Sequence, residues 1–290
     1  MHFYKNGNYF IIMYNDGTKI RFNNENEFIP KFAENIDITI TTKCDGGCNY
    51  CYLNCNNNGI HADLSQRFFD TLHKGQEIAI NGNDLSHPEL EDFLIRMKHK
   101  GVICNITINQ IHFIREIEFI RYLYNSKLIN GLGVSLVNSD DELFIKYINE
   151  FDNAVVHVID GLFTIRDIEK LKNNNIKLLI LGYKILGRGD TYYNNNKTYI
   201  ENNISYLSDN IVEVCNYFDI VSFDNLALEH LNIKSKIPKF MWDKYYMGNE
   251  GCFTFYIDAV NKTFAKSSTE LVQYPILNSV DSMFKYIQEV

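Results

Sequence analysis

The sequence has few of the features that mark membrane, secreted or nucleic-acid-binding proteins. No run of about 18 apolar residues occurs in the chain, so a transmembrane helix and a membrane partner are not expected. The opening residues Met1-His2-Phe3-Tyr4 lack the apolar core of a signal peptide, which predicts a cytoplasmic location. Lys and Arg total 28 against 36 Asp and Glu. The resulting net charge of −8 argues against a nucleic-acid partner.

Proline is also scarce, with 4 residues in 290, and no proline- or serine-rich stretch marks a linker. Apolar residues make up 46% and charged residues 22% of the chain, as in ordinary globular proteins. The length is sufficient for one large α/β domain with small additions. Seven cysteines, three of them clustered, fit a reducing compartment and a metal site better than a disulfide framework.

Short β-branched runs alternate with amphipathic runs through the middle of the chain. Strands are expected at residues 36–42, 77–81, 102–108, 133–137, 154–159 and 176–181. Helices are expected at residues 63–75, 88–97, 111–124, 140–149 and 164–172. Strand-then-helix units in series predict a parallel sheet, curled into a partial (β/α)6 TIM-like barrel. Functional residues of such sheets collect in the loops beyond the carboxyl ends of the strands.

Shorter elements flank this series. Residues 9–14 and 18–22 predict an N-terminal β-hairpin around the turn signal Asn15-Asp16-Gly17, and we expect it to cover an edge of the barrel. Later segments are a helix at 199–214, a strand at 220–223 and two short strands around a turn at 259–262. The predicted division is a hairpin at 1–33, a barrel core at 34–225 and a small α+β extension at 226–290 that packs on the barrel.

The loop after the first strand of the series holds Cys44, Cys48 and Cys51 in a C-x3-C-x2-C array. Gly46 and Gly47 let the chain curl, so that three thiolates can point at one centre. Soft thiolates suit an iron–sulfur cluster or a metal ion, and three of them leave one coordination position open. Two alternatives are a zinc knuckle completed by Cys55 and a ferredoxin-like cluster, although ferredoxin runs have a different spacing. We assign Cys55 no role.

This array, with Tyr50 directly before its third cysteine, resembles the signature of the radical S-adenosylmethionine (radical SAM) superfamily. The resemblance covers roughly residues 36–190. It implies a [4Fe-4S] cluster held by Cys44, Cys48 and Cys51, with S-adenosylmethionine on the fourth iron and Tyr50 beside the cofactor. It further implies reductive cleavage of S-adenosylmethionine to a 5′-deoxyadenosyl radical, which abstracts a hydrogen atom from the substrate. An electron donor such as flavodoxin or ferredoxin is implied as a partner.

The same resemblance assigns residues at other strand ends to the cofactor. Gly82-Asn83-Asp84 stands where the family has Gly-Gly-Glu, and Asp84 keeps a carboxylate for the ammonium of S-adenosylmethionine. The alternative for that segment is an Asx-type turn before a helix. Further cofactor-binding residues by this resemblance are Asn109, Ser135, Asn138, Gly182 and Tyr183, for which capped turns are the alternative.

Arg188, four residues after Lys184, gives the predicted barrel mouth a cationic pair. Guanidinium and ammonium groups bind carboxylates and phosphates, so we expect Arg188 to contact the cofactor or the substrate. A solvated loop is the alternative.

Cys252 and the following Tyr256-Ile257-Asp258 resemble the opening of the auxiliary-cluster (SPASM-like) domain of peptide-modifying members. Ala265-Lys266-Ser267-Ser268 stands where a Pro-Cys pair would continue that pattern, so an intact auxiliary-cluster domain is not expected. Cys252 is then a candidate catalytic residue that donates a hydrogen atom to a substrate radical. The alternative is a buried apolar cysteine.

We therefore expect a radical SAM enzyme that modifies a peptide or protein. Modification of a nucleotide or small metabolite is the alternative reaction. A zinc-binding structural or interaction module is the alternative without catalysis.

Overall fold

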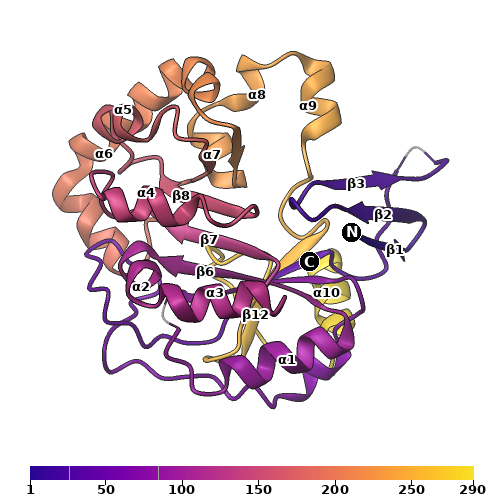
Figure 1. The fold of residues 1–290 in the computed structure, drawn as a ribbon. Coiled ribbons are helices and arrows are strands. Elements are labelled where there is room, and N and C mark those ends of the chain that lie inside the picture. The colour runs from indigo at the N-terminus through magenta and orange to yellow at the C-terminus, as the bar shows by residue number, and fades with distance from the viewer. Residues whose placement is uncertain (26, 84) are drawn as a thin grey trace.

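The computed structural model describes residues 1–25, 27–83 and 85–290, which form two sheets (Figure 1). The smaller sheet is antiparallel and consists of β1 (His2–Asn6), β2 (Tyr9–Met13) and β3 (Lys19–Phe22). The predicted hairpin is thus confirmed as β2 and β3. The preceding strand β1 was missed because its only periodic signal is a run of mixed polar and aromatic residues.

The larger sheet has ten strands in the order β10-β9-β8-β7-β6-β5-β4-β11-β12-β13. Its parallel strands are β4 (Asn35–Thr39), β5 (Glu77–Asn83), β6 (Ile103–Asn109), β7 (Gly131–Ser135), β8 (Ala154–Ile159), β9 (Lys177–Leu181), β10 (Ile220–Phe223) and β11 (Thr254–Asp258). The antiparallel strands β12 (Thr263–Ala265) and β13 (Tyr274–Pro275) complete it. The chain is therefore a mixed α/β protein with a large parallel sheet, as predicted. β11 pairs with β4, so the C-terminal segment extends the same sheet; the domain division at residues 33 and 225 stays a prediction.

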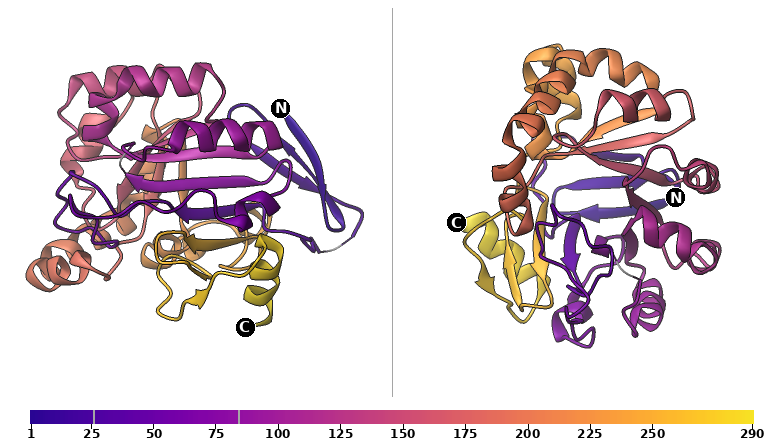
Figure 2. Two further views of the ribbon diagram at one scale, coloured as in Figure 1. Left: turned by 90° about the horizontal axis from the view of Figure 1, so that it is seen from below. Right: turned by 90° about the vertical axis from the view of Figure 1, so that its left-hand side faces the viewer.

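Helices surround this sheet on its outer face and ends (Figures 1 and 2). They are α1 (Leu90–Lys100), α2 (Gln110–Arg115), α3 (Ile117–Asn125), α4 (Glu142–Ile148), α5 (Ile165–Leu171), α6 (Arg188–Val214), α7 (Asn225–His230), α8 (Ile233–Lys236), α9 (Lys239–Tyr245) and α10 (Val280–Glu289), with 3-10 turns η1 (Arg67–Thr71) and η2 (Cys215–Tyr217). In the described part of the chain, no helix is both long enough and apolar enough to cross a membrane.

Three of the predicted helices differ from the structure. The helix expected at 63–75 is only the 3-10 turn η1, in which Phe68 and Phe69 are both buried. The helix expected at 111–124 is divided into α2 and α3 at Glu116. The helix expected from 199 begins at Arg188, and its backbone is non-helical at Asn196.

Side chains alternate between the two faces of each parallel strand. In β4, Ile36 and Ile38 are fully buried on the outer face, whereas Asp37 between them reaches the concave face. In β8, Val156 and Val158 lie outward and His157 inward. The concave face therefore receives the polar residues of the strands.

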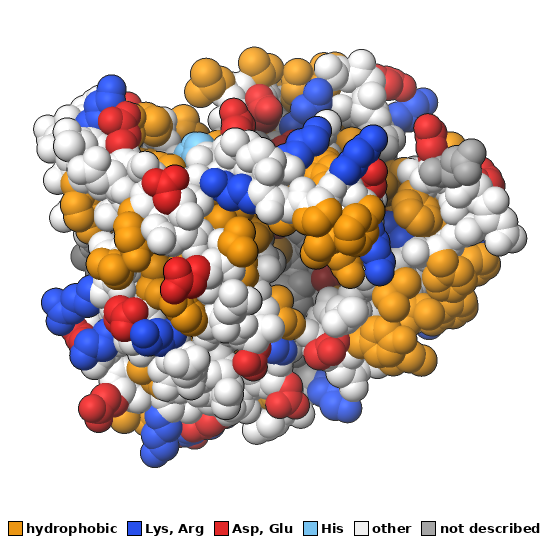
Figure 3. Space-filling view, turned by 90° about the horizontal axis from the view of Figure 1, so that it is seen from above, with side chains coloured by type: hydrophobic (Ala, Val, Ile, Leu, Met, Phe, Trp, Pro, Cys, Tyr) orange, Lys and Arg blue, Asp and Glu red, His pale blue; other side chains and the backbone are white. Residues whose placement is uncertain are grey.

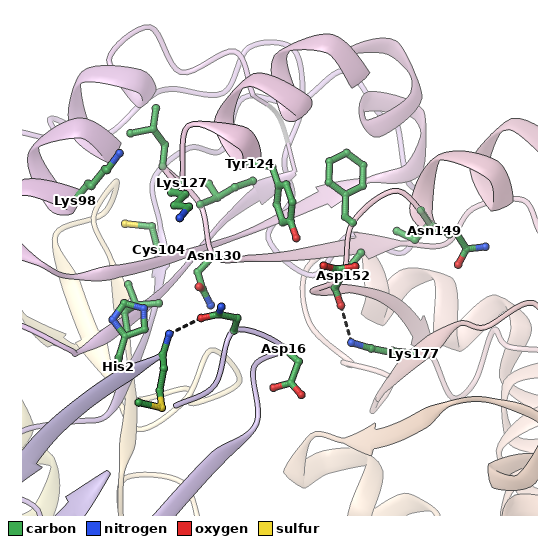
Figure 4. A pocket seen from close by; sticks show the side chains of 18 of the residues that line it. His2, Asp16, Lys98, Cys104, Tyr124, Lys127, Asn130, Asn149, Asp152 and Lys177 are labelled. Atoms are coloured by element: carbon green, nitrogen blue, oxygen red, sulfur yellow. Dashed lines mark hydrogen bonds between the residues drawn. The ribbon is translucent and has the colours of Figure 1, made fainter. Parts of the chain in front are cut away.

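The turn of the N-terminal hairpin meets the amino ends of the parallel strands. Asn15 and Asp16 line a cavity of about 1060 Å³ together with Asn130 and Lys177 (Figure 4). On the other side of the same turn, Gly17 lines the cavity on the concave face of the large sheet. The hairpin thus closes the amino-terminal end of that concave face.

The outward face of the small sheet exposes a row of stacked phenylalanines. Ring centroids of Phe3 and Phe10 are 5.6 Å apart, and those of Phe10 and Phe22 are 5.7 Å apart. Hydrophobic side chains gather at the corresponding end of the molecule in the space-filling view (Figure 3). Stacking across adjacent strands stabilises the sheet even where its outer face meets solvent.

A buried carboxylate joins the small sheet to the large one. Glu34, 1% exposed, accepts hydrogen bonds from Tyr9 Oη at 2.5 Å and from Arg21 Nε at 2.7 Å. Lys19 Nζ lies 3.3 Å from Glu34 Oε2 and also pairs with Glu77 at the start of β5. A buried charge needs such partners because its desolvation is otherwise uncompensated.

Substitution of Glu34→Ala leaves Arg21 without its buried counter-ion and leaves Lys19 with Glu77 alone. We expect the free energy of unfolding, measured by urea denaturation, to fall by about 3–5 kcal/mol. The exposed Glu270→Ala serves as control and changes it by about 0.5 kcal/mol or less. An equal effect of the two substitutions would show that Glu34 does not join the sheets.

Candidate functional site

The cysteine loop, residues 41–61, follows β4 and folds back on itself. Cys44 N donates to Asn56 O at 3.0 Å, and Asn56 N donates to Thr42 O at 3.0 Å. Thr41 also forms an antiparallel bridge with His61. This backbone pairing places Cys55 next to Cys44, although the two are far apart in the array.

Each cysteine of the predicted triad accepts hydrogen bonds from N–H groups. Cys44 Sγ accepts from Gly46 N at 3.4 Å, and Cys48 Sγ accepts from Asn109 Nδ2 at 3.6 Å. Cys51 Sγ accepts from the backbone N–H groups of Leu53 and Cys55. N–H donors of this kind support thiolates that bind iron.

The thiols of Cys51 and Cys55 are hydrogen-bonded to each other. This interaction lowers the pKa of Cys51 and raises the pKa of Cys55. Burial raises the pKa of Cys48 and of Tyr50, which is hydrogen-bonded to Cys48.

Arg188, at the start of α6, forms several hydrogen bonds with the cysteine loop. Its Nε donates to Cys48 O at 3.0 Å and its Nη2 donates to Cys55 O at 2.8 Å. Its backbone N–H donates to Cys51 O at 3.1 Å and to Asn54 Oδ1 at 2.8 Å. The guanidinium is thus engaged with the loop backbone, and its predicted contact with the cofactor or the substrate stays a prediction.

Asp45 fastens the other side of the same loop to α2. Its carboxylate accepts from Arg115 Nη1 at 2.7 Å and lies 2.5 Å from Nε2 of the fully buried His112. The hydrogen bonds from Arg115 and His112 lower the pKa of Asp45. Sequence reasoning missed this anchor because His112 and Arg115 belong to a helix whose place beside the loop follows only from the fold.

A cavity of about 540 Å³ opens on the concave face of the large sheet beside the cysteine loop. Cys48 and Cys51 line it from the loop. The predicted cofactor residues that line it are Tyr50, Asn109, Ser135, Gly182 and Tyr183. The cysteine loop and the ends of the strands therefore line the same cavity, and a ligand in this cavity can contact both.

Tyr183 and Gly182 are held at the end of β9 by buried carboxylates. Tyr183 N donates to Asp160 Oδ1 at 2.9 Å, and burial raises the pKa of its phenol to about 12. Gly182 N donates to Asp224 Oδ1 at 2.9 Å, and a Cβ on Gly182 would overlap Leu226. Glycine is required at this position because α7 approaches the strand so closely.

Other predicted residues lie elsewhere. Gly82 packs against Thr41 with φ +136° and does not line the cavity. Asn138 is exposed and its Oδ1 accepts from Asp140 N in a turn. Cys252 is exposed on the loop before β11, not buried, and it does not line the cavity either. Asp84 lies outside the described residues, as does the side chain of Asn83.

Asp37 faces the cavity and was not predicted as a site residue, and Lys184, the other member of the predicted cationic pair, faces it too. Lys184 Nζ donates to Ser268 Oγ at 2.9 Å and lies 4.1 Å from the centroid of the Tyr52 ring. Burial lowers the pKa of Lys184, but nearby Tyr52, Asp224 and Asp37 outweigh it, so the net change is upward. Burial raises the pKa of Asp37. Asp37 could have been suspected from sequence, because it interrupts a strand between two isoleucines.

His157 lies over Gly133 on the concave face. A Cβ on Gly133 would overlap the imidazole, so glycine makes room for this ring on the neighbouring strand. Burial lowers the pKa of His157 to about 4. The imidazole is therefore neutral at physiological pH and acts as a hydrogen-bonding group of the cavity wall.

The loop fits an iron–sulfur cluster by its donor chemistry. It supplies three thiols, N–H donors to each sulfur, and the cationic Arg188 beside them. Within residues 1–25, 27–83 and 85–290, no three His, Cys, Asp or Glu side chains converge as ligands of a single metal ion would. A cluster does not need such convergence, since each cysteine binds a different iron.

The fold is similar to that of Streptococcus suis SuiB. A crystal structure of SuiB bound to S-adenosylmethionine matches with a TM-score of 0.55 and 15% sequence identity, over 85% of this chain and 64% of the SuiB chain. A further crystal structure of SuiB matches with a TM-score of 0.51 and 16% identity over the same shares. At this identity the likeness establishes the fold, and the chain spans less than two thirds of SuiB. No protein family and no curated protein matches the sequence.

Replacement of Arg188 by Lys removes the two-pronged contact with the carbonyls of Cys48 and Cys55. Loss of a charge-assisted hydrogen bond, worth about 1.5–3 kcal/mol, eases opening of the loop. We expect alkylation of the buried Cys55 in the metal-free protein to accelerate about tenfold or more, as followed by mass spectrometry. Arg166→Lys, on the surface of α5, is the matched control and leaves the rate unchanged. Equal alkylation rates in both variants would show that the contacts of Arg188 do not hold the loop closed.

The lowered pKa of His157 predicts that its imidazole stays neutral well below pH 6.5. The unfolded chain binds that proton more readily, so the stability that His157 contributes is lost as the pH falls from about 6.5 towards 4. The Cε1 proton resonance, followed by NMR, should titrate near pH 4. His230, whose hydrogen bond to Asp160 raises its pKa, should titrate above its ordinary value and provides the internal comparison. A His157 titration near 6.5 would contradict the buried placement.

Proposed function

We propose that this chain is a radical SAM enzyme that modifies a peptide or protein. The observation that carries the proposal is the position of the cysteine loop. It lies beyond the carboxyl end of β4, and Cys48 and Cys51 line the same cavity as the ends of β6, β7 and β9. The likeness in fold to SuiB, solved with S-adenosylmethionine, supports the same assignment.

In this proposal, Cys44, Cys48 and Cys51 hold a [4Fe-4S] cluster. When bound, the cluster would supply the one electron needed to cleave S-adenosylmethionine to methionine and a 5′-deoxyadenosyl radical, and that radical would take a hydrogen atom from the substrate. The N–H donors at each sulfur stabilise the thiolates, and Arg188 and Asp45 keep the loop in one conformation. An exposed protein surface near the loop would receive the electron donor, for which a flavodoxin or ferredoxin is suited.

The cavity residues bind and orient S-adenosylmethionine. Asn109 would contact the cofactor from the wall of the cavity, and its Nδ2 donates to Cys48 Sγ at 3.6 Å. Gly182 lines the cavity, and Tyr183 is fixed beside it by its hydroxyl, which donates to Gly189 O at 2.9 Å. Enclosure by the curved sheet, which we take to be a partial (β/α)6 barrel, excludes water from a reactive radical.

The walls of the cavity combine hydrogen-bonding and apolar groups. The strands β4, β5 and β6 contribute the neutral polar side chains Asn35, Asn81, Asn105 and Thr107, and Asn153 lies just before β8, whereas Val155, Ile159, Leu179 and Leu181 are apolar. Amide side chains both donate and accept, as peptide backbone requires. The acidic chain offers no general attraction for nucleic acid. A peptide substrate therefore fits the site better than a nucleotide.

Anaerobic reconstitution with iron and sulfide tests the cluster. We expect visible charge-transfer absorbance and formation of 5′-deoxyadenosine from S-adenosylmethionine with a strong reductant. Cys51→Ala should abolish this formation, because it removes an iron ligand, whereas Cys55→Ala should retain it. Equal loss in both variants would favour a four-cysteine site, and binding of zinc without absorbance would sink the enzyme assignment.

The substrate class is tested by the rate of 5′-deoxyadenosine formation in the presence of candidate substrates. A peptide substrate should accelerate the rate several-fold by completing the active site. Acceleration by nucleotides alone, with no response to any peptide of a diverse library, would favour the alternative reaction.

A further inference from the structure

His157 lies in the cavity wall and has no role in the function proposed above. Its Cα pairs in register with that of Ser135 on β7, and Ser135 pairs with Asn109 on β6. Ser135 and Asn109 are the residues of this row that we expect to contact S-adenosylmethionine. The imidazole of His157, however, lies over Gly133, two residues nearer the amino end of β7. The ring therefore extends from the row of cofactor residues into the deeper part of the cavity.

Two glycines of β7 make room for polar side chains of the neighbouring strands. A Cβ on Gly133 would lie 2.3 Å from Cε1 and 2.5 Å from Nε2 of His157 on β8. A Cβ on Gly131 would lie 2.8 Å from Oδ1 of Asn105 on β6. Both glycines line the cavity. Glycine inside a strand often marks a place where another group approaches the backbone closely, and here polar groups approach from both sides.

These polar groups have hydrogen-bonding capacity that the protein leaves unused. Within residues 1–25, 27–83 and 85–290, neither ring nitrogen of His157 has a hydrogen-bond partner. Asn105 Oδ1 is buried and has no donor in the same residues, although Asn105 Nδ2 donates to Glu77 Oε2 at 3.3 Å. Thr107, which pairs in register with Gly133, also lines the cavity there. Buried polar groups are normally paired, so unused donors and acceptors around a cavity indicate a ligand.

The unused groups are neutral, which defines the chemistry of that ligand. Burial lowers the pKa of His157 to about 4, so the imidazole offers one donor and one acceptor at neutral pH. Glu77, the nearest carboxylate to Asn105, is already paired with Lys19. A carboxylate or ammonium of a ligand would lose its hydration here without gaining a counter-ion. An amide donates and accepts without charge and matches these groups.

We propose that His157 is a specificity-determining residue that hydrogen-bonds an amide group of the peptide substrate below the cofactor. This inference rests on the proposed function. With S-adenosylmethionine at the carboxyl ends of the strands, the rest of the cavity extends over Gly133 and Gly131 towards the hairpin turn at Gly17. An amide bound at His157 keeps a neighbouring carbon of the substrate facing the cofactor.

The test is an NMR titration of the reconstituted protein, oxidised and with S-adenosylmethionine bound, using N-acetyl-L-alaninamide as the probe. We expect saturable shifts of the His157 Cε1 proton and of the Gly133 amide proton. The Cε1 proton of His230, which does not line the cavity, should not shift. Acetate and methylammonium carry a charge and should leave the His157 resonance in place.

Two substitutions of His157 separate its hydrogen bonds from its bulk. His157→Leu removes both ring nitrogens and should raise the Kd of the probe about five- to tenfold, as followed at the Gly133 amide proton. His157→Gln keeps a neutral donor and acceptor and should stay within about twofold of the wild type. His99→Leu, an exposed position on α1, is the matched control and leaves the Kd unchanged.

An unchanged Kd in His157→Leu would overturn the inference, as would tighter binding of acetate or methylammonium than of the amide. A nucleobase also carries amide groups. Shifts of His157 with uridine and none with N-acetyl-L-alaninamide would therefore assign the site to a nucleotide and overturn the inference as well. Failure of the wild-type protein to form any cluster would refute the proposed function instead. The same titration of the metal-free protein would still show whether His157 binds the amide, so the two failures are distinguishable.

Discussion

The alternation of side chains along the parallel strands is the constraint on which the site depends. Outward positions carry Ile, Val and Leu that pack under the helices, so the inward positions are free to be small or polar. Closed barrels of this general type fill their interior with bulky branched residues. Here β7 places Gly131 and Gly133 inward, and neighbouring strands place Asp37, Asn105 and His157 there. The sheet consequently surrounds a cavity where a packed core would otherwise lie.

The cysteine loop is fixed before any ligand arrives. Backbone pairing, the Asp45 contact with α2 and the Arg188 contact with α6 hold it from three directions. Sites held by a supporting shell lose less conformational entropy when they bind. A loop rich in glycine and asparagine would otherwise sample many conformations. Contacts with helices α2 and α6, which are distant in the sequence, therefore limit the conformations of the loop.

Local patterns in the sequence were enough to predict the parallel strands, since β-branched runs such as 154–159 have few alternative structures. The cysteine spacing likewise identified the loop that lines the cavity. Residues whose role depends on tertiary contacts could not be found in this way. Arg188 was expected to face a ligand because guanidinium groups bind anions, yet only the fold reveals that the backbone of the loop is its partner. Nothing local in the sequence pairs Glu34 with the hairpin.

Prediction also failed for some of the shorter elements. The segment around Phe68 and Phe69 was predicted as part of an α-helix, whereas it forms only the 3-10 turn η1. The strands β2 and β3 were predicted from the turn signal Asn15 to Gly17 between them. The third strand of this sheet, β1, has no comparable turn signal in the sequence. β11 lies in the extension that was expected to pack on the barrel, and its pairing with β4 is a long-range contact that no local pattern indicates.

The contact between Arg188 and Cys48 joins residues 140 positions apart in the chain. At about 5–20 residues per second, a ribosome needs on the order of ten seconds to synthesise that interval. During this time the cysteines of the loop have been synthesised but Arg188, which binds the loop backbone, has not. The native arrangement of the thiols is therefore established only after the parallel strands β4 to β9 have emerged. Maturation of the site is a late event of biosynthesis, tied to the completion of the sheet and not to the appearance of the cysteines.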